Sequence, residues 1–173
     1  MKKQASHHRG YSLLEVMIAL AVLSIGLLGL ASLQVQGMRF NTDSYLRTQA
    51  TILAYDIIDR MRANTVGSDA GVYCLDVVAP ADPCATNSVP SASAVNTCGD
   101  TVSGCASPAE LARYDISRWY ALQDANLPVA ATRSTISRSI VTLGGGNIIY
   151  EYTVTMRWQE RGVHIEQQWV VEI

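Results

Sequence analysis

The sequence has no charged side chain between Val16 and Met38, and no proline in the same stretch. Without charges, the segment can cross the hydrocarbon core of a bilayer, for which about 20 apolar residues suffice. Without proline, a helix formed by this segment has no encoded sharp kink. The sequence therefore predicts one long apolar helix near the amino terminus.

The sequence also has few residues that could make up a catalytic site. Its three histidines are His7, His8 and His164, and the first two lie in a basic segment before the apolar run. His164 falls on the polar side of a predicted strand, where a solvated side chain is expected. No two carboxylates form a persuasive acid–base pair. These observations predict a protein that is not an enzyme and has no cofactor.

Basic residues are outnumbered by acidic ones. The chain has 13 Lys and Arg against 15 Asp and Glu. Lys2, Lys3 and Arg9 lie in the first ten residues, so the rest of the chain has 10 basic residues against 15 acidic ones. Non-specific binding of nucleic acid needs a basic surface. The charge balance therefore predicts no nucleic-acid partner.

One carboxylate, that of Glu15, lies at the start of the apolar run. An ionised carboxylate in the centre of a bilayer costs roughly 2.5–3.5 kcal/mol. Glu15 must therefore reach the headgroup region, as in an ordinary membrane anchor, or meet a positively charged partner. Only the second interpretation gives Glu15 a role in assembly.

The segment before the apolar run is short, polar and basic, and it ends in Gly10. A secretory signal would have a small-residue cleavage site after its apolar stretch, and no such site follows Leu33. We therefore expect residues 1–10 to be a removable leader and the apolar segment to be retained. Basic residues stay cytoplasmic, so the chain beyond the span should face outward. The alternative is an ordinary single-span membrane protein from which the leader is not cleaved.

Gly10, Tyr11 and Glu15, together with the basic leader and the apolar helix, resemble the class III signal of type IV pilins and type II secretion pseudopilins. The resemblance implies that a prepilin peptidase cuts after Gly10 and methylates the new amino terminus at Tyr11. It also implies that Glu15 pairs with the terminal amine of a neighbouring subunit, which offsets much of the desolvation of both charges. Tyr11 departs from the Phe or Met most often found there, but is similar in bulk.

Two further fragments, Glu110–Trp119 and Tyr152–Trp158, resemble PilV-type minor pilins of type IV pili. This resemblance implies a structural subunit that contacts other minor pilins and the major pilin through its amino-terminal helix. It implies a tip complex that primes assembly and supports display of an adhesin, and contact with the inner-membrane assembly platform. The chain would be inserted in the inner membrane before it reaches the pilus and the cell surface.

Two related functions are alternatives. A minor pseudopilin of a type II secretion system has the same signal and the same helix, and the genes beside this one would separate the two. A DNA-uptake pilin is disfavoured by the acidic charge of the mature chain.

The apolar pattern changes beyond Arg39, where apolar residues recur at spacings of three and four: Leu46, Ala50, Leu53, Ala54, Ile57, Ile58 and Met61. We expect one helix from Ser12 to Asn64, roughly 80 Å long. Its residues 11–38 would form the transmembrane or filament-core part and residues 39–64 an amphipathic half. The amphipathic half should lie on a sheet, and the apolar half should project from a globular head of residues 65–173.

All four cysteines lie in a predicted loop region, Thr65–Ala106: Cys74, Cys84, Cys98 and Cys105. Disulfides persist in the periplasm, and the spacing contains no Cys-x-x-Cys pair of the kind that binds zinc. The cysteines are therefore predicted to form structural disulfides and no metal site. Four cysteines allow three pairings, and local pairing of Cys74 with Cys84 and of Cys98 with Cys105 is the working hypothesis.

The remaining residues predict a second helix followed by three antiparallel strands. Ser107 and Glu110 form a capping box with Pro108 at the first helical position. Leu111, Asp115, Trp119 and Leu122 are expected to share a face of this helix, with Trp119 in the core. Alternating segments within residues 134–173 predict a β-meander whose apolar face covers the first helix. The fold class is therefore α+β, the pilin-like fold that the resemblance implies.

Overall fold

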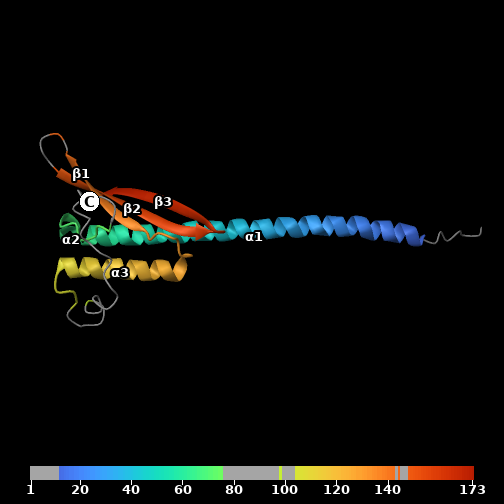
Figure 1. The fold of residues 1–173 in the computed structure, drawn as a ribbon, viewed down its shortest axis with the longest axis horizontal. Helices are drawn as coiled ribbons and strands as arrows, with labels where there is room; N and C mark the ends of the chain where they lie inside the picture. Colours follow the sequence, from blue (N-terminus) through green and yellow to red (C-terminus); the bar gives the residue numbers. More distant parts are fainter. Residues whose placement is uncertain (1–11, 76–97, 99–103, 143, 145–147) are drawn as a thin grey trace, which may run out of the picture. The chain divides into compact units, whose positions relative to one another are not determined.

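A computed structural model describes residues 12–75, 98, 104–142, 144 and 148–173 (Figure 1). The elements in chain order are α1 (Leu13–Ala63), α2 (Thr65–Asp69), α3 (Pro108–Asn126), β1 (Thr135–Thr142), β2 (Ile148–Glu160) and β3 (Val163–Glu172). The predicted α+β fold class, with a long first helix, a second helix and an antiparallel sheet, is confirmed. The chain divides into two units, Met1–Asp43 and Ser44–Ile173, so α1 contributes to both.

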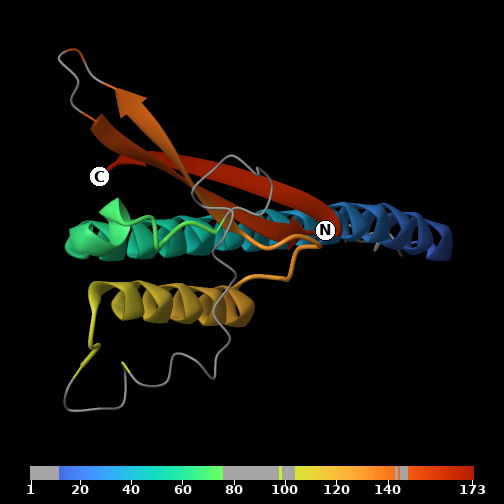
Figure 2. The ribbon, with the colours of Figure 1, turned by 60° about the vertical axis from the view of Figure 1, so that its left-hand side comes forward.

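In the second unit, residues 44–63 of α1 form the centre of the hydrophobic core. The seven apolar side chains predicted from the spacing are all buried: Leu46, Ala50, Leu53, Ala54, Ile57, Ile58 and Met61. Figure 2 shows the sheet on one side of this part of α1 and α3 on the other. The predicted amphipathic half therefore packs as expected, because a 3.6-residue period places these side chains on one continuous stripe.

α1 ends at Asn64, whose backbone leaves the helical region at φ −113° and ψ 64°. Its side-chain oxygen accepts a hydrogen bond from Gly67 N (3.1 Å), which caps α2. Its amide nitrogen donates to the carbonyl oxygen of Pro108 (2.8 Å) at the start of α3. One side chain thus ties three helices together.

The start of α3 has the predicted Ser107 cap, but the Glu110 carboxylate bonds the backbone N–H of Ala106, whereas in a standard capping box it would bond that of Ser107. The Ser107 hydroxyl accepts from Glu110 N (3.2 Å), and the Glu110 carboxylate accepts from Ala106 N (2.9 Å). The predicted face is partly wrong: Asp115 and Trp119 are buried, but Leu111 is 37% exposed. The buried face instead runs through Ala112, Asp115, Ile116, Trp119, Tyr120 and Gln123. Trp119 fixes α3 to α1, since its Nε1 donates to the carbonyl oxygen of Leu53 (2.9 Å).

The sheet is antiparallel with strand order β1-β2-β3. Alternate residues of β2 form its inward face, where Tyr152, Val154, Met156 and Trp158 are fully buried. A tight turn at Arg161 and Gly162 joins β2 to β3, and both residues have positive φ (51° and 82°). Positive φ at both central residues gives the twist that a two-residue hairpin needs.

Cys98 and Cys105 form a disulfide, which confirms this half of the pairing hypothesis. Cys74 is also disulfide-bonded. Cys84 lies outside the described residues, so the pairing of Cys74 with Cys84 stays a prediction.

Candidate functional site

The largest candidate interaction surface is the apolar segment of α1, residues 13–40. Every residue from 12 to 42 is exposed, including Leu13 (78%), Leu28 (71%) and Met38 (71%). A helix that is apolar on all sides is stable only in lipid or among other apolar helices. This surface therefore requires a membrane or neighbouring helices as its environment.

Two hydroxyl side chains along this helix bond to its own backbone. The Ser24 hydroxyl donates to the carbonyl oxygen of Leu20 (2.7 Å), and the Thr42 hydroxyl donates to that of Met38 (3.1 Å). In lipid an unsatisfied polar group costs several kcal/mol. Such internal bonding lets these hydroxyls lie in an apolar environment.

Glu15 lies in the first turn of α1 and is exposed. The helix starts where Glu15 N and Val16 N donate to the carbonyl oxygen of Ser12 (2.9 and 3.3 Å). A negative charge here is favoured by the positive end of the helix dipole, typically by about 0.3–1 kcal/mol. Within the part of the chain that the structure describes, no ion pair to Glu15 is present. The predicted cleavage residues Gly10 and Tyr11 lie outside that part.

α1 is the one helix among the described residues that is long and apolar enough to cross a membrane. Its apolar segment, residues 13–40, contains the charge-free stretch from Val16 to Met38. The helix therefore fits a membrane anchor.

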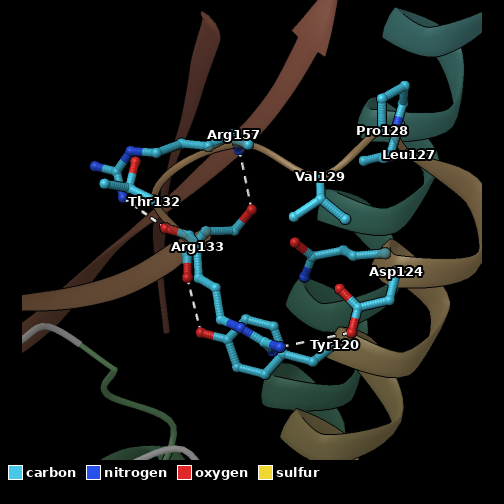
Figure 3. A pocket seen from close by; sticks show the side chains of 11 residues that line it. Tyr120, Asp124, Leu127, Pro128, Val129, Thr132, Arg133 and Arg157 are labelled. Carbon is cyan, nitrogen blue, oxygen red and sulfur yellow. Dashed lines mark hydrogen bonds and ion pairs between the residues drawn. The ribbon is translucent and has the colours of Figure 1, made fainter.

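The second unit contains a small pocket between α3, the connector 127–134 and β2 (Figure 3). The Tyr120 hydroxyl donates to the carbonyl oxygen of Ser134 (2.7 Å), and burial raises the pKa of Tyr120 to about 12. The Arg133 guanidinium lies 5.0 Å above the Tyr120 ring and 3.6 Å from the Asp124 carboxylate. The cavity volume of about 30 Å³ excludes an ordinary metabolite, because small-molecule sites measure roughly 300–1,000 Å³.

Gln123 lines this pocket and is 7% exposed. Its amide nitrogen Nε2 is buried and has no hydrogen-bond partner among the described residues. Leaving a buried donor unsatisfied costs about 1–3 kcal/mol, and such groups are rare. Sequence analysis did not single out Gln123, because nothing in the local pattern marks a glutamine as lacking a partner.

A partly buried charge network, centred on the buried Asp115, joins the end of α1 to α3. Asp115 accepts from Arg60 Nη1 (3.0 Å) and from the Tyr73 hydroxyl (2.6 Å), and Arg60 Nε also donates to Asp56 (2.9 Å). Burial and the hydrogen bond to Asp115 raise the pKa of Tyr73. Burial opposes the charge of Arg60, but its two carboxylate partners outweigh it and raise the pKa of Arg60. The network positions α3 against α1.

A second buried carboxylate, that of Glu160, ends β2. It accepts from Arg47 Nε and Nη2 (both 3.3 Å) and from Trp158 Nε1 (2.9 Å). Burial raises the pKa of Glu160, but the bonds from Arg47 and Trp158 outweigh burial and lower it. The sequence pattern did not reveal this role of Glu160; its alternation with Trp158 on β2 was the available signal.

The described residues contain no cluster of three His, Cys, Asp or Glu side chains that could hold a metal ion. His164 lies exposed on β3.

Comparison with known families gives two adjoining matches. Residues 5–31 match the prokaryotic N-terminal methylation motif, and residues 32–117 match the family described as type IV pilin Tt1218. Neither the curated proteins nor the solved structures contain a significant match. The first match includes Gly10, Tyr11 and Glu15, and the second continues along α1 into α3. With the long apolar helix, the antiparallel sheet and the disulfide, these matches show that the chain is a type IV pilin-like protein, in a family of structural subunits.

Proposed function

We propose that this chain is a minor pilin of a type IV pilus, a structural subunit of a tip complex that primes pilus assembly. The observation that carries the proposal is the exposed apolar segment of α1 with Glu15 in its first turn. A simple anchor needs the apolar residues but not the carboxylate. In a subunit that packs against other helices, the apolar residues would form the helix contacts and the carboxylate could pair with a positive charge of a neighbour.

Cleavage between Gly10 and Tyr11 would create the partner of Glu15. The new terminal amine would lie two residues before the start of α1 at Leu13, close to the positive end of the helix dipole. Both favour a nearby carboxylate, and Glu15 of a neighbouring subunit supplies one. Two opposite charges in contact offset much of the desolvation that each would suffer alone. The pair would therefore set the axial register between subunits.

As a minor pilin, the chain would be located first in the inner membrane and then in the pilus, and would have several protein partners. Prepilin peptidase and the assembly platform would act on the chain in the inner membrane, with the leader cytoplasmic and Ser44–Ile173 periplasmic. The Cys98–Cys105 disulfide supports an oxidising compartment. Other minor pilins and the major pilin would cover the apolar segment of α1, and the assembled tip would present an adhesin at the cell surface.

A clean deletion strain tests the priming role. We expect deletion to reduce the number of surface pili without changing the amount of major pilin in the cell. Complementation with Glu15→Ala should leave processing intact and fail to restore piliation, whereas Glu172→Ala, which removes an exposed carboxylate on β3, should restore it. Normal piliation in the deletion strain would overturn the priming role.

The same strain separates the pilus from a type II secretion system. A minor pseudopilin would show its loss as reduced export of secreted proteins with surface pili intact. We expect deletion of this chain to reduce surface pili and to leave the export of secreted proteins unchanged.

A further inference from the structure

We propose that the pocket beside Gln123 holds a backbone carbonyl group from an extended segment of another subunit of the assembly. The inference rests on the proposed function, because it requires that the chain has neighbouring subunits. It concerns a contact made by the second unit, separate from the apolar segment of α1.

The pocket exists because β2 is longer than its neighbour β1. Their pairing begins at Thr135 with Thr155, and β2 continues to Glu160. Past this point the connector replaces β1, with the Ser134 hydroxyl accepting from Arg157 N (2.9 Å) and Pro128 O accepting from Gln159 N (3.2 Å). The pocket is lined by the connector between these two attachment points. The connector therefore forms an irregular rim that an incoming chain can meet.

Gln123 supplies the donor that lacks an acceptor. Its side chain comes from α3 and is more than nine-tenths buried, and Nε2 has no partner among the described residues. Buried amide groups in folded proteins are almost always bonded. A hydrogen-bond acceptor that enters the pocket would remove this defect.

The charges around the pocket favour a neutral acceptor. Arg133 lies near Asp124 (3.6 Å), and Arg157 Nε lies 2.7 Å from Glu166. Figure 3 shows the Arg133 side chain over Tyr120, with a dashed line joining it to Asp124. Because each arginine already has a carboxylate, no excess positive charge remains to select a phosphate or a carboxylate.

The size and lining of the pocket favour a peptide over a sugar. The Tyr120 ring is 5% exposed and is covered by Arg133, so it offers no open aromatic face for a sugar to stack on. The volume of about 30 Å³ accommodates a single small group and not a whole molecule. A carbonyl oxygen on an extended chain has this size, and the exposed Val129 at the rim (71%) can contact the adjoining side chain.

Entry requires a small movement of the rim, because Nε2 is inaccessible in this conformation. Residues 128–133 have no helix or strand, and Val129 is largely exposed. Their displacement would break the hydrogen bonds that Pro128 O accepts from Gln159 N and Arg133 O accepts from Arg157 Nη1, but no core packing. Segments of this kind open at low cost.

Photo-crosslinking in cells that assemble the complete structure tests the proposal with the full-length chain. One variant carries a photoreactive residue at Val129 on the pocket rim, and a second carries it at Leu27 in the apolar segment of α1. A third carries it at Ile140, an exposed residue of β1 that serves as the surface control. We expect Val129 and Leu27 to give crosslinks to other pilin subunits, identified by mass spectrometry, and Ile140 to give none at comparable yield.

Removal of the donor then identifies the bond. Gln123→Leu should lower the Val129 crosslink by about fivefold, as loss of one neutral hydrogen bond predicts, and leave the Leu27 crosslink unchanged. The matched change Gln167→Leu, at an exposed glutamine of β3, should change neither. If Gln123→Leu impairs folding, Val129→Trp with the photoreactive residue moved to Ala131 blocks the rim from an exposed position and should give the same loss.

The outcomes separate this proposal from the proposed function. Crosslinks at Leu27 without any at Val129 would overturn the pocket and leave the pilin role standing. The proposal would also be overturned if Gln123→Leu left the Val129 crosslink unchanged and Val129→Trp left the crosslink from Ala131 unchanged. That result would assign the pocket to internal water. Crosslinks from Val129 to sugar or lipid only would reject a protein occupant, and absence of subunit crosslinks at both positions would reject both proposals.

Discussion

Arg47 on α1 and Glu160 at the end of β2 form a bidentate ion pair, although 113 residues separate them in the sequence. Both N–O distances are 3.3 Å, and Trp158 Nε1 donates a third hydrogen bond to the same carboxylate. Glu160 is 5% exposed, whereas the Arg47 side chain is 60% exposed. The pair therefore holds the end of the β2–β3 hairpin against α1 from the edge of the core.

Loss of Arg47 should destabilise the second unit. Arg47→Met leaves a buried carboxylate with only Trp158 as donor, and because Arg47 is largely solvated we expect a loss of about 1–2 kcal/mol. Adding Glu160→Gln to Arg47→Met should recover part of the lost stability, since the glutamine amide carries no charge. Urea unfolding of the full-length chain in detergent measures both, with Arg62→Met in an exposed pair as the control. An equal loss in Arg62→Met would contradict the assigned role.

Stability should also depend on pH through Glu160. Its pKa in the folded protein lies below the ordinary value of 4.5, so the carboxylate stabilises the fold above that value. The contribution should be lost as pH falls through the lowered pKa. Melting curves at pH 7 and at about pH 3 should show a smaller pH effect in Glu160→Gln than in the natural chain. Glu166→Gln, which removes an exposed carboxylate, should change the pH effect less.

The network at the buried Asp115 should matter more than exposed ion pairs. Asp115→Asn removes the charge facing Arg60 and weakens the bond to Tyr73, so we expect a loss of about 2–3 kcal/mol. Asp59→Asn, in an exposed pair with Arg62 at 3.7 Å, should cost less than about 0.5 kcal/mol. Denaturant midpoints of the two variants give the comparison. Equal midpoints would show that the network does not hold α3.

Gly71 should not tolerate a side chain. Its φ of +72° costs an L-residue about 1–2 kcal/mol. An added Cβ would also lie 2.8 Å from Arg138 Nη2. The Arg138 guanidinium is fixed there because Nη1 donates to Asp69 O (2.8 Å) and the group lies over the Tyr150 ring. Gly162→Ala has the same conformational cost at φ +82° with open space around it, so Gly71→Ala should lower the unfolding midpoint further.

Reduction of the disulfides should act locally. The Cys98–Cys105 bridge is expected to contribute about 2–3 kcal/mol by closing a short loop in the unfolded chain. Limited proteolysis with reductant should show new cuts within residues 70–106, while residues 44–63 and the three strands stay protected. The double variant Cys98→Ser/Cys105→Ser should reproduce the cuts nearest that bridge. First cuts within β2 would show that the disulfide supports the sheet instead.

Local pattern was enough to predict the elements of the fold except α2, whose residues Thr65–Asp69 were predicted to lie in a loop. The spacing from Leu46 to Met61 identified the buried stripe of α1, and Ser107 with Glu110 identified the start of α3. Leu111 was misplaced because helical spacing gives the relative position of side chains but not which face meets the core. The packed face of α3 is set by Trp119 and its bond to Leu53 of α1, a contact between distant parts of the chain.

Among the candidate functional residues, too, some could be identified from the local sequence and others could not. Glu15 stood out because a charge in an apolar run is costly wherever the chain folds. Glu160 and Gln123 did not, since their significance comes from what surrounds them: Arg47 in one case, and the absence of an acceptor in the other. Contacts over such separations are formed by tertiary packing, which no short segment encodes.

The mass of the mature amino-terminal peptide tests the central claim most directly. If the chain is processed as a pilin, material isolated from the envelope should begin at Tyr11 with one added methyl group, and Gly10→Val should leave the precursor uncut. Glu15→Ala should give the same processed terminus, which would separate cleavage from assembly. A natural chain that keeps an unmodified Met1 would contradict the account, because the amine that Glu15 is proposed to meet would then never form.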